Sequence, residues 1–133
     1  MSTEGQHAPA RVSVQRGIDH YDDPGAVRAL VDEALASLML PEEYVRPGDR
    51  VVLKPNWVKE HDERHPGPAQ WEHVVTHPAV IEAVIRWVAG RLNGDGSIVV
   101  CDAPQTDSSF STLSAYCGCL LYTSDAADEE DSV

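Results

Sequence analysis

The sequence predicts an α/β fold, built on an incomplete parallel, Rossmann-like sheet of about three strands with helices. Two observations support this expectation. Short β-branched or alternating segments are separated by longer segments with helical periodicity, and the connections are long enough for crossovers. The order strand, helix, strand, helix, strand is typical of parallel strands joined by right-handed crossovers. These elements are too few to cover a sheet on both faces, so we expect a fragment of a larger domain with an exposed apolar surface.

Three segments are expected as strands. Arg11–Gly17 alternates apolar and polar residues with a period of two. Arg50–Trp57 is β-branched and is stopped by Pro55, and Ser97–Asp102 is a similar run with Cys101 in its interior. The second and third segments lack strict alternation, which indicates burial on both faces and predicts that Cys101 is a small buried side chain.

The first helix is expected to begin at Asp23 and Pro24, a capping carboxylate followed by a residue that suits the first turn, and to end by Pro41. Apolar residues then recur at helical spacing. They are Val27, Leu30, Val31, Ala34, Leu35 and Leu38. One face of this helix should therefore pack on the rest of the domain.

The second helix is expected to open at Thr76 to Pro78 and to end at Asn93 and Gly94, which tolerate the left-handed conformation of a helix C-terminus. Its apolar stripe is Ile81, Val84, Ile85, Val88 and Leu92. A third helix is expected within Ser108–Tyr116.

Both ends of the sequence are expected to lie outside the domain. Residues 1–10 are small and polar and predict a disordered lead. Cys119–Glu129 is what one reading frame of a common transposase sequencing adapter encodes, so we interpret residues 119–133 as a non-native, adapter-derived tail. Residues 11–118 would then be the N-terminal part of an α/β domain, and the natural gene would be cut short.

The charge of the chain argues against polyanionic partners. The net charge is −12; without the five acids of residues 119–133, 17 acidic residues stand against 10 basic ones, a net charge of −7. An acidic chain has no global field that attracts nucleic acid or anionic lipid, so we expect neither partner. No apolar run approaches the length of a membrane span, and no signal peptide is visible, so we expect a cytoplasmic protein with free thiols.

Polar residues are expected to converge at one edge of the sheet. Lys54 and Asn56 leave the second strand, Thr76 and His77 start the next helix, and Asp102 leaves the third strand. In an open parallel sheet, ligands bind outside the carboxyl ends of the strands. An ammonium, an amide side chain and the free amides of a helix N-terminus would together favour a carboxylate or phosphate.

Each of these residues has a structural alternative. Lys54 could reach solvent or pair with Asp102 rather than bind a ligand. Asp102 could orient Lys54, hold a divalent cation or cap the next helix, and capping is the simplest of the three. His77 is a candidate general base, although a histidine in a first helical turn more often serves packing or local hydrogen bonding. The histidines of the polar stretch Val58–Val75 match no zinc signature, so no metal site is expected.

Three spaced motifs resemble the N-terminal region of domain of unknown function family 362. They are Lys-Pro-Asn at Lys54 to Asn56, Thr-His-Pro at Thr76 to Pro78, and Asp-Ala-Pro at Asp102 to Pro104. Family members typically have glycine before that aspartate, where this chain has Cys101. The resemblance implies that Lys54, Pro55, Asn56, Thr76, His77, Pro78, Asp102 and Pro104 are motif positions. Some relatives carry ferredoxin-like iron-sulfur segments, but this chain has no Cys-X-X-Cys, so no cluster role transfers to it.

Three functions remain open on these observations. The first is an enzyme or ligand-binding domain for a small anionic molecule, with Lys54, Asn56, Thr76 and His77 as an anion cradle beside Asp102. The second is a noncatalytic scaffold or partner-binding domain that uses Val58–Val75 as its contact surface. The third is part of an iron-sulfur-linked redox protein whose cluster segment is missing. Substrate, reaction and cofactor are unknown from the sequence.

Overall fold

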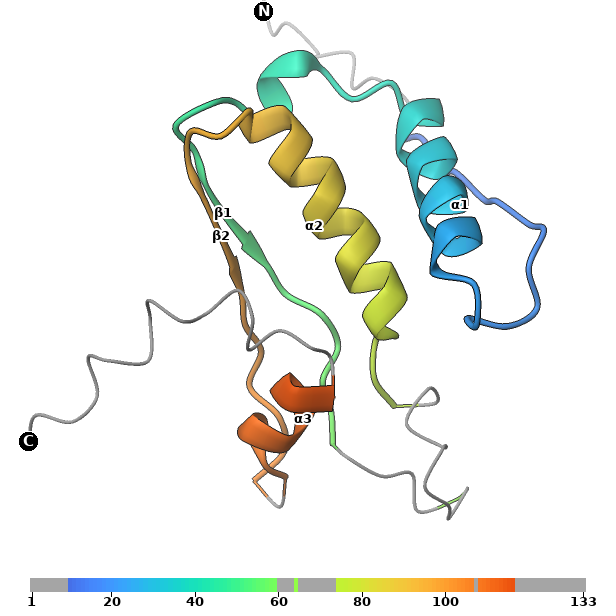
Figure 1. The fold of residues 1–133 in the computed structure, drawn as a ribbon, viewed down its shortest axis with the longest axis vertical. Helices are drawn as coiled ribbons and strands as arrows, with labels where there is room; N and C mark the ends of the chain where they lie inside the picture. The colour runs from blue at the N-terminus through green and yellow to red at the C-terminus, as the bar shows by residue number, and fades with distance from the viewer. Residues whose placement is uncertain (1–9, 60–63, 65–73, 107, 117–133) are drawn as a thin grey trace, which may run out of the picture.

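The computed structural model of the 133-residue chain describes residues 10–59, 64, 74–106 and 108–116. Figure 1 shows two parallel strands on one side of a long helix and a second helix on the other. In chain order the elements are α1 (Pro24–Ser37), the 3-10 helix η1 (Glu42–Tyr44), β1 (Arg50–Leu53), α2 (Pro78–Leu92), β2 (Ser97–Val100) and α3 (Phe110–Tyr116). The chain is therefore a mixed α/β structure, as expected.

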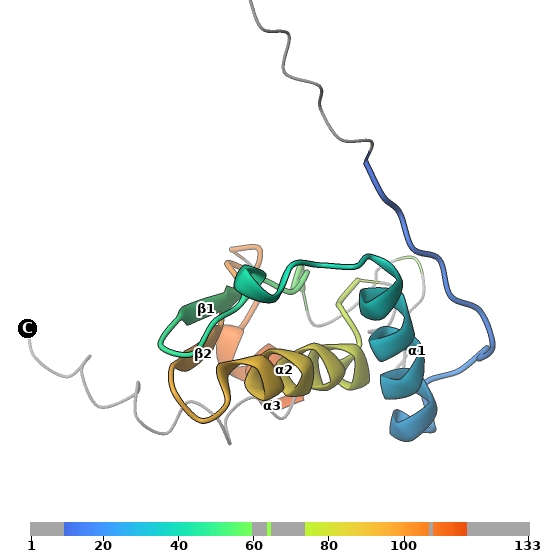
Figure 2. The same cartoon turned by 90° about the horizontal axis from the view of Figure 1, so that it is seen from above.

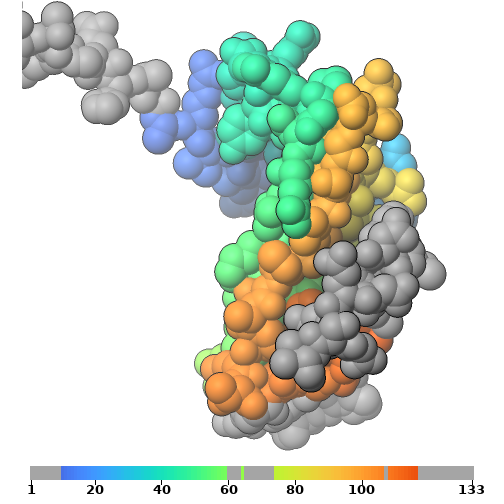
Figure 3. All heavy atoms as spheres, turned by 90° about the vertical axis from the view of Figure 1, so that its left-hand side faces the viewer, coloured from blue at the N-terminus to red at the C-terminus, as the bar shows by residue number. Residues whose placement is uncertain are grey.

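The sheet of the described residues consists of β1 and β2, which pair in parallel from Arg50 opposite Ser97 to Leu53 opposite Val100. Helix α2 connects them and packs on one face, where Leu53 and Ile98 join its buried side chains. The opposite face lies at the surface, as Figure 3 shows for β1 in green and β2 in orange. Val52 on β1 is 57% exposed, which fits the expected exposed apolar surface.

Two expectations about strands are wrong. Arg11–Gly17 forms no strand; it runs as irregular chain beside α1, with Val12 and Val14 86% and 72% exposed. An alternating pattern gives a strand only when a neighbouring strand takes up its backbone hydrogen bonds, and no strand pairs with this segment among the described residues. The expected third strand is also shorter than predicted, because β2 ends at Val100, and Cys101 is an exposed free thiol rather than a buried side chain.

Helix α1 begins where its sequence predicts. One oxygen of Asp23 accepts hydrogen bonds from the amides of Gly25 and Ala26 at 2.9 and 3.1 Å, which caps the helix. The helix ends at Ser37, before Pro41, and Met39 then adopts a left-handed conformation with φ 52°. Its apolar face packs against α2 (Figure 2), yet only Val27 is fully buried.

Helix α2 is the most buried element of the described chain. Its buried residues are Ala79, Ile81, Ala83, Ile85, Val88 and Leu92. The helix ends with Asn93 at φ 50° and Gly94 at φ 81°, which confirms the predicted left-handed exit. Gly96 then lies against the start of β1, because a Cβ atom there would be 2.5 Å from the carbonyl oxygen of Asp49. This turn sets how α2 returns to the sheet.

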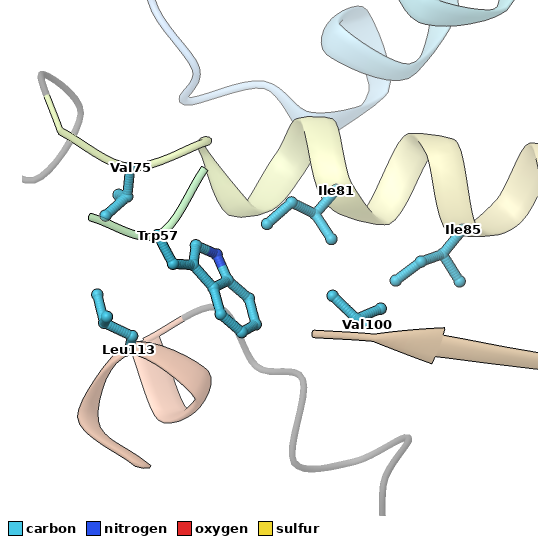
Figure 4. Close-up of a cluster of buried hydrophobic side chains, with 6 residues drawn as sticks. All are labelled: Trp57, Val75, Ile81, Ile85, Val100 and Leu113. Carbon is cyan, nitrogen blue, oxygen red and sulfur yellow. The ribbon is translucent and has the colours of Figure 1, made fainter. Parts of the chain in front are cut away.

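The main hydrophobic core is built around Trp57. The Trp57 indole is fully buried and lies among Leu113 of α3, Ile81 of α2 and Val100 of β2 (Figure 4). Its backbone forms an isolated antiparallel bridge with Val75. β1 therefore ends at Leu53 rather than running to Trp57, and the segment that follows it leads into the core.

Candidate functional site

The carboxylate of Asp102 and the ammonium of Lys54 form an ion pair at the carboxyl ends of the two strands. The Lys54 Nζ atom lies 2.5 Å from Asp102 Oδ1, with the lysine side chain 71% exposed and the aspartate side chain 6% exposed. The two residues come directly or shortly after β1 and β2, so parallel pairing brings them together. The structure contains both parts of the structural alternative for Lys54, because the side chain pairs with Asp102 and also reaches solvent.

Asp102 connects three segments of the chain. Its Oδ2 accepts a hydrogen bond from the Trp57 amide at 2.7 Å, and its Oδ1 accepts one from the Ala103 amide at 2.9 Å. Burial of the carboxylate raises the pKa of Asp102, but the hydrogen bond from Lys54, the two amides and the lysine charge outweigh it, so the pKa lies below its usual range. This carboxylate is therefore ionised at neutral pH.

The expectation that Asp102 caps the following helix is wrong. Helix α3 begins at Phe110, and its cap is Ser109, whose Oγ accepts from the Thr112 amide at 3.3 Å. Asp102 instead joins the segment after β1 to the segment after β2. The intervening residues move the helix start away from the carboxylate.

Asn56 and Thr76 form a second polar contact beside the ion pair. The Asn56 amide donates to Thr76 Oγ1 at 2.9 Å, and the Thr76 amide donates to the Asn56 carbonyl at 2.8 Å. The Asn56 side chain donates to the Val74 carbonyl at 3.3 Å. Both residues thereby fix the segment after β1 against the segment before α2, and the Asn56 side-chain amide is used in that structural contact.

His77 caps α2 and stacks on an aromatic ring. Its Nδ1 accepts from the Ala79 amide at 3.2 Å, and its ring stacks on Tyr21 with centroids 4.2 Å apart. The amides of Val80 and Ile81 donate to the His77 carbonyl at 3.0 and 3.2 Å. Because Pro78 has no amide hydrogen, the first turn of α2 has no free donor for an anion, and the expected contribution of free helix amides is wrong.

A hollow of about 200 Å³ opens next to Lys54. Its lining is mostly apolar and comes from the end of β1, from Thr76 and from one side of α2. The residues are Leu53, Lys54, Pro55, Thr76, Val80, Ile81 and Val84. Two of the sequence-predicted residues, Lys54 and Thr76, therefore share a concave surface, whereas Asp102 supports Lys54 and His77 lies outside the lining.

Two contacts of this region were not predicted from the sequence. Trp57 provides the amide that holds Asp102, and only its position directly after Lys-Pro-Asn could have suggested this. Tyr21 packs on His77 from a segment without periodicity, so no sequence pattern identifies it. Most of the polar stretch Val58–Val75, the expected contact surface of the alternative function, lies outside the described residues.

Comparisons of the chain with models of protein families, with curated proteins and with solved structures found no match. Within the described ranges, no helix is long and apolar enough to cross a membrane. No three histidine, cysteine or acidic side chains of that same part of the chain converge as a metal site would require.

Proposed function

We propose that this chain is a binding domain for a small amphiphilic anion, in which the hollow beside Lys54 takes the apolar part and the lysine ammonium takes the charge. An exposed lysine among the lining residues of an apolar hollow is the observation that supports the proposal. An ammonium has three N–H donors, and Asp102 uses one of them, so two remain for a ligand. The Thr76 hydroxyl, which accepts from Asn56, has its own proton to donate.

The lining favours a carboxylate with a short hydrocarbon chain over inorganic phosphate. Leu53, Val80, Ile81 and Val84 can bury methylene groups, each worth about 0.8 kcal/mol when fully removed from water. Phosphate has no apolar surface to bury, and the first turn of α2 offers it no free amide. Because Asp102 already neutralises most of the lysine charge, we expect weak binding, with a Kd of about 1 mM.

No reaction is part of this proposal. His77 Nδ1 is occupied as the cap of α2, and the residue is not part of the lining of the hollow, so we assign it a positioning role for the helix rather than catalysis. We also propose kinship with domain of unknown function family 362, on the three motifs that contain Lys54, Thr76 and Asp102. In this structure each of these motifs supplies at least one hydrogen bond or ion pair of the region.

The proposal is tested by titrating the full chain with hexanoate and, separately, with inorganic phosphate, using calorimetry and NMR chemical shifts. Lys54→Gln removes the charge but keeps a donor for Asp102, and it should weaken hexanoate binding about tenfold. Arg28→Gln is the matched control, because it removes one cation that pairs with Asp32 at 3.8 Å on the surface of α1. Equal hexanoate affinity of the two variants would refute the role of Lys54.

A further inference from the structure

The outer edge of β1 is open in this structure. Among the described residues, β1 pairs with β2 alone, so its second edge presents backbone groups without a strand partner. Val52, in the middle of the strand, is 57% exposed although it belongs to a β-branched run. Exposed strand edges with apolar side chains are the places where an additional extended segment adds to a sheet.

A groove of about 620 Å³ runs beside this edge. Its lining comes from β1, from one side of α2, from the end of α1 and from Tyr44 of η1. Leu35, Leu38, Val51, Val52 and Trp87 are among the residues that line it, and most of the lining is aliphatic or aromatic. The groove therefore combines free backbone groups with apolar walls.

The chain itself contains a segment that matches this groove. Arg11–Arg16 has the alternating pattern of a strand, with Val12 and Val14 on one side and Ser13 and Gln15 on the other. Both valines are largely exposed where they now lie. The contacts that hold the segment against α1 include a 2.6 Å hydrogen bond between the hydroxyls of Ser13 and Ser37 and a 3.3 Å bond from Arg11 to the Leu38 carbonyl. These contacts are exposed, so water can replace them.

The connection between Arg11–Arg16 and α1 is long enough for this segment to move from its place along α1 to the open edge of β1. Gly17 has φ 148°, a conformation that favours glycine, and the irregular residues 17–23 separate it from the first turn of α1. Seven residues span up to about 23 Å when extended, which exceeds the diameter of a helix. The segment runs antiparallel to α1, since Ser13 lies by Ser37 at the end of the helix, and α1 in turn runs opposite to β1 (Figure 1). Docked on β1, it would be parallel to it, with α1 as the crossover.

We propose that Arg11–Arg16 docks into the groove as a third, parallel strand on β1, and that the present structure contains the undocked position of this segment. Docking would bury Val12 and Val14 against α2 and the end of α1. It would also give the open edge of β1 hydrogen-bond partners. The chain would then switch between an open groove and a groove closed by its own N-terminal segment.

The experiment compares two double variants of the full chain. Val12→Asp with Val14→Asp places two charges on the side that docks, and Ser13→Asp with Gln15→Asp places the same charges on the other side. If the segment docks, the first pair should lower the melting temperature by about 5 °C or more and speed amide hydrogen exchange of Arg50 and Val52, which face the open edge, at least about tenfold. The second pair should change neither.

Equal behaviour of the two double variants would overturn the proposal, because the undocked position exposes both valines and predicts surface effects only. Sedimentation of the unaltered chain gives a second criterion. Slow exchange of β1 that appears only at concentrations where dimers form would show that a second copy supplies the strand, and it would overturn docking within one chain. Docking within one chain is supported if β1 exchanges slowly in the monomer and this protection is lost in the Val12 and Val14 variant.

Discussion

Replacing Asp102 with alanine is expected to destabilise the chain about three times as much as replacing its partner Lys54. The difference arises because the two sides of the ion pair lie in different surroundings, 6% exposed for the aspartate and 71% for the lysine. Loss of Lys54 removes an ammonium that water already screens, and exposed ion pairs contribute up to about 1 kcal/mol. The carboxylate keeps its two backbone amides in that variant.

Loss of Asp102 removes an acceptor from the Trp57 amide, which lies next to a fully buried indole. A buried donor without a partner costs about 1–3 kcal/mol, and the lost contacts with Lys54 and Ala103 add to this. The Ala103 amide is exposed and can bond to water. We therefore expect about 3 kcal/mol for Asp102→Ala and about 1 kcal/mol for Lys54→Ala, which is a large share of the 5–15 kcal/mol typical of a folded domain.

Urea unfolding of the two variants, followed by far-ultraviolet circular dichroism, measures both values, provided that the slope m is unchanged. Arg28→Ala is the control for loss of an exposed cation and should change stability by at most about 0.5 kcal/mol. A Lys54→Ala variant that is as unstable as Asp102→Ala would refute the reasoning. It would mean that Asp102 stabilises the fold mainly through its ion pair with the lysine rather than through the hydrogen bonds from the backbone amides.

Two further predictions concern stability. Because the folded pKa of Asp102 is lowered, its stabilising effect is complete above the unfolded pKa of about 3.9 and is lost as the pH falls through the lower folded value. Asp102→Asn should therefore flatten the decline in unfolding free energy below about pH 4, and an unchanged decline would contradict this. Gly96→Ala should lower the free energy of unfolding in urea by about 2 kcal/mol or more, since φ is 127° and the new Cβ would meet the Asp49 carbonyl oxygen at 2.5 Å. Gly90→Ala is the control, because Gly90 has open space around it in α2, and it should be neutral or stabilising.

Much of the candidate region was predictable because parallel strands end at a common edge. Lys54 and Asp102 follow two strands that were both located in the sequence, so their proximity follows from the parallel pairing. The contacts that each residue makes were not predictable in the same way. Asp102 was expected to cap a helix, and its actual amide partner, Trp57, is 45 residues away in sequence. His77 was correctly placed at the start of α2, but its stacking on Tyr21 depends on how residues 18–23 return past that helix.

The sequence by itself determined the helices and their ends. Asp23 with Pro24, and His77 with Pro78, cap their own helices, and Asn93 ends α2, because each effect acts within one or two turns of the same backbone. Only the tertiary structure decided which segment became a strand. Arg11–Gly17 has a strand pattern but no strand partner here, because sheet hydrogen bonds are made between segments and their formation depends on what lies alongside. The same dependence on distant neighbours gave Lys54 its carboxylate.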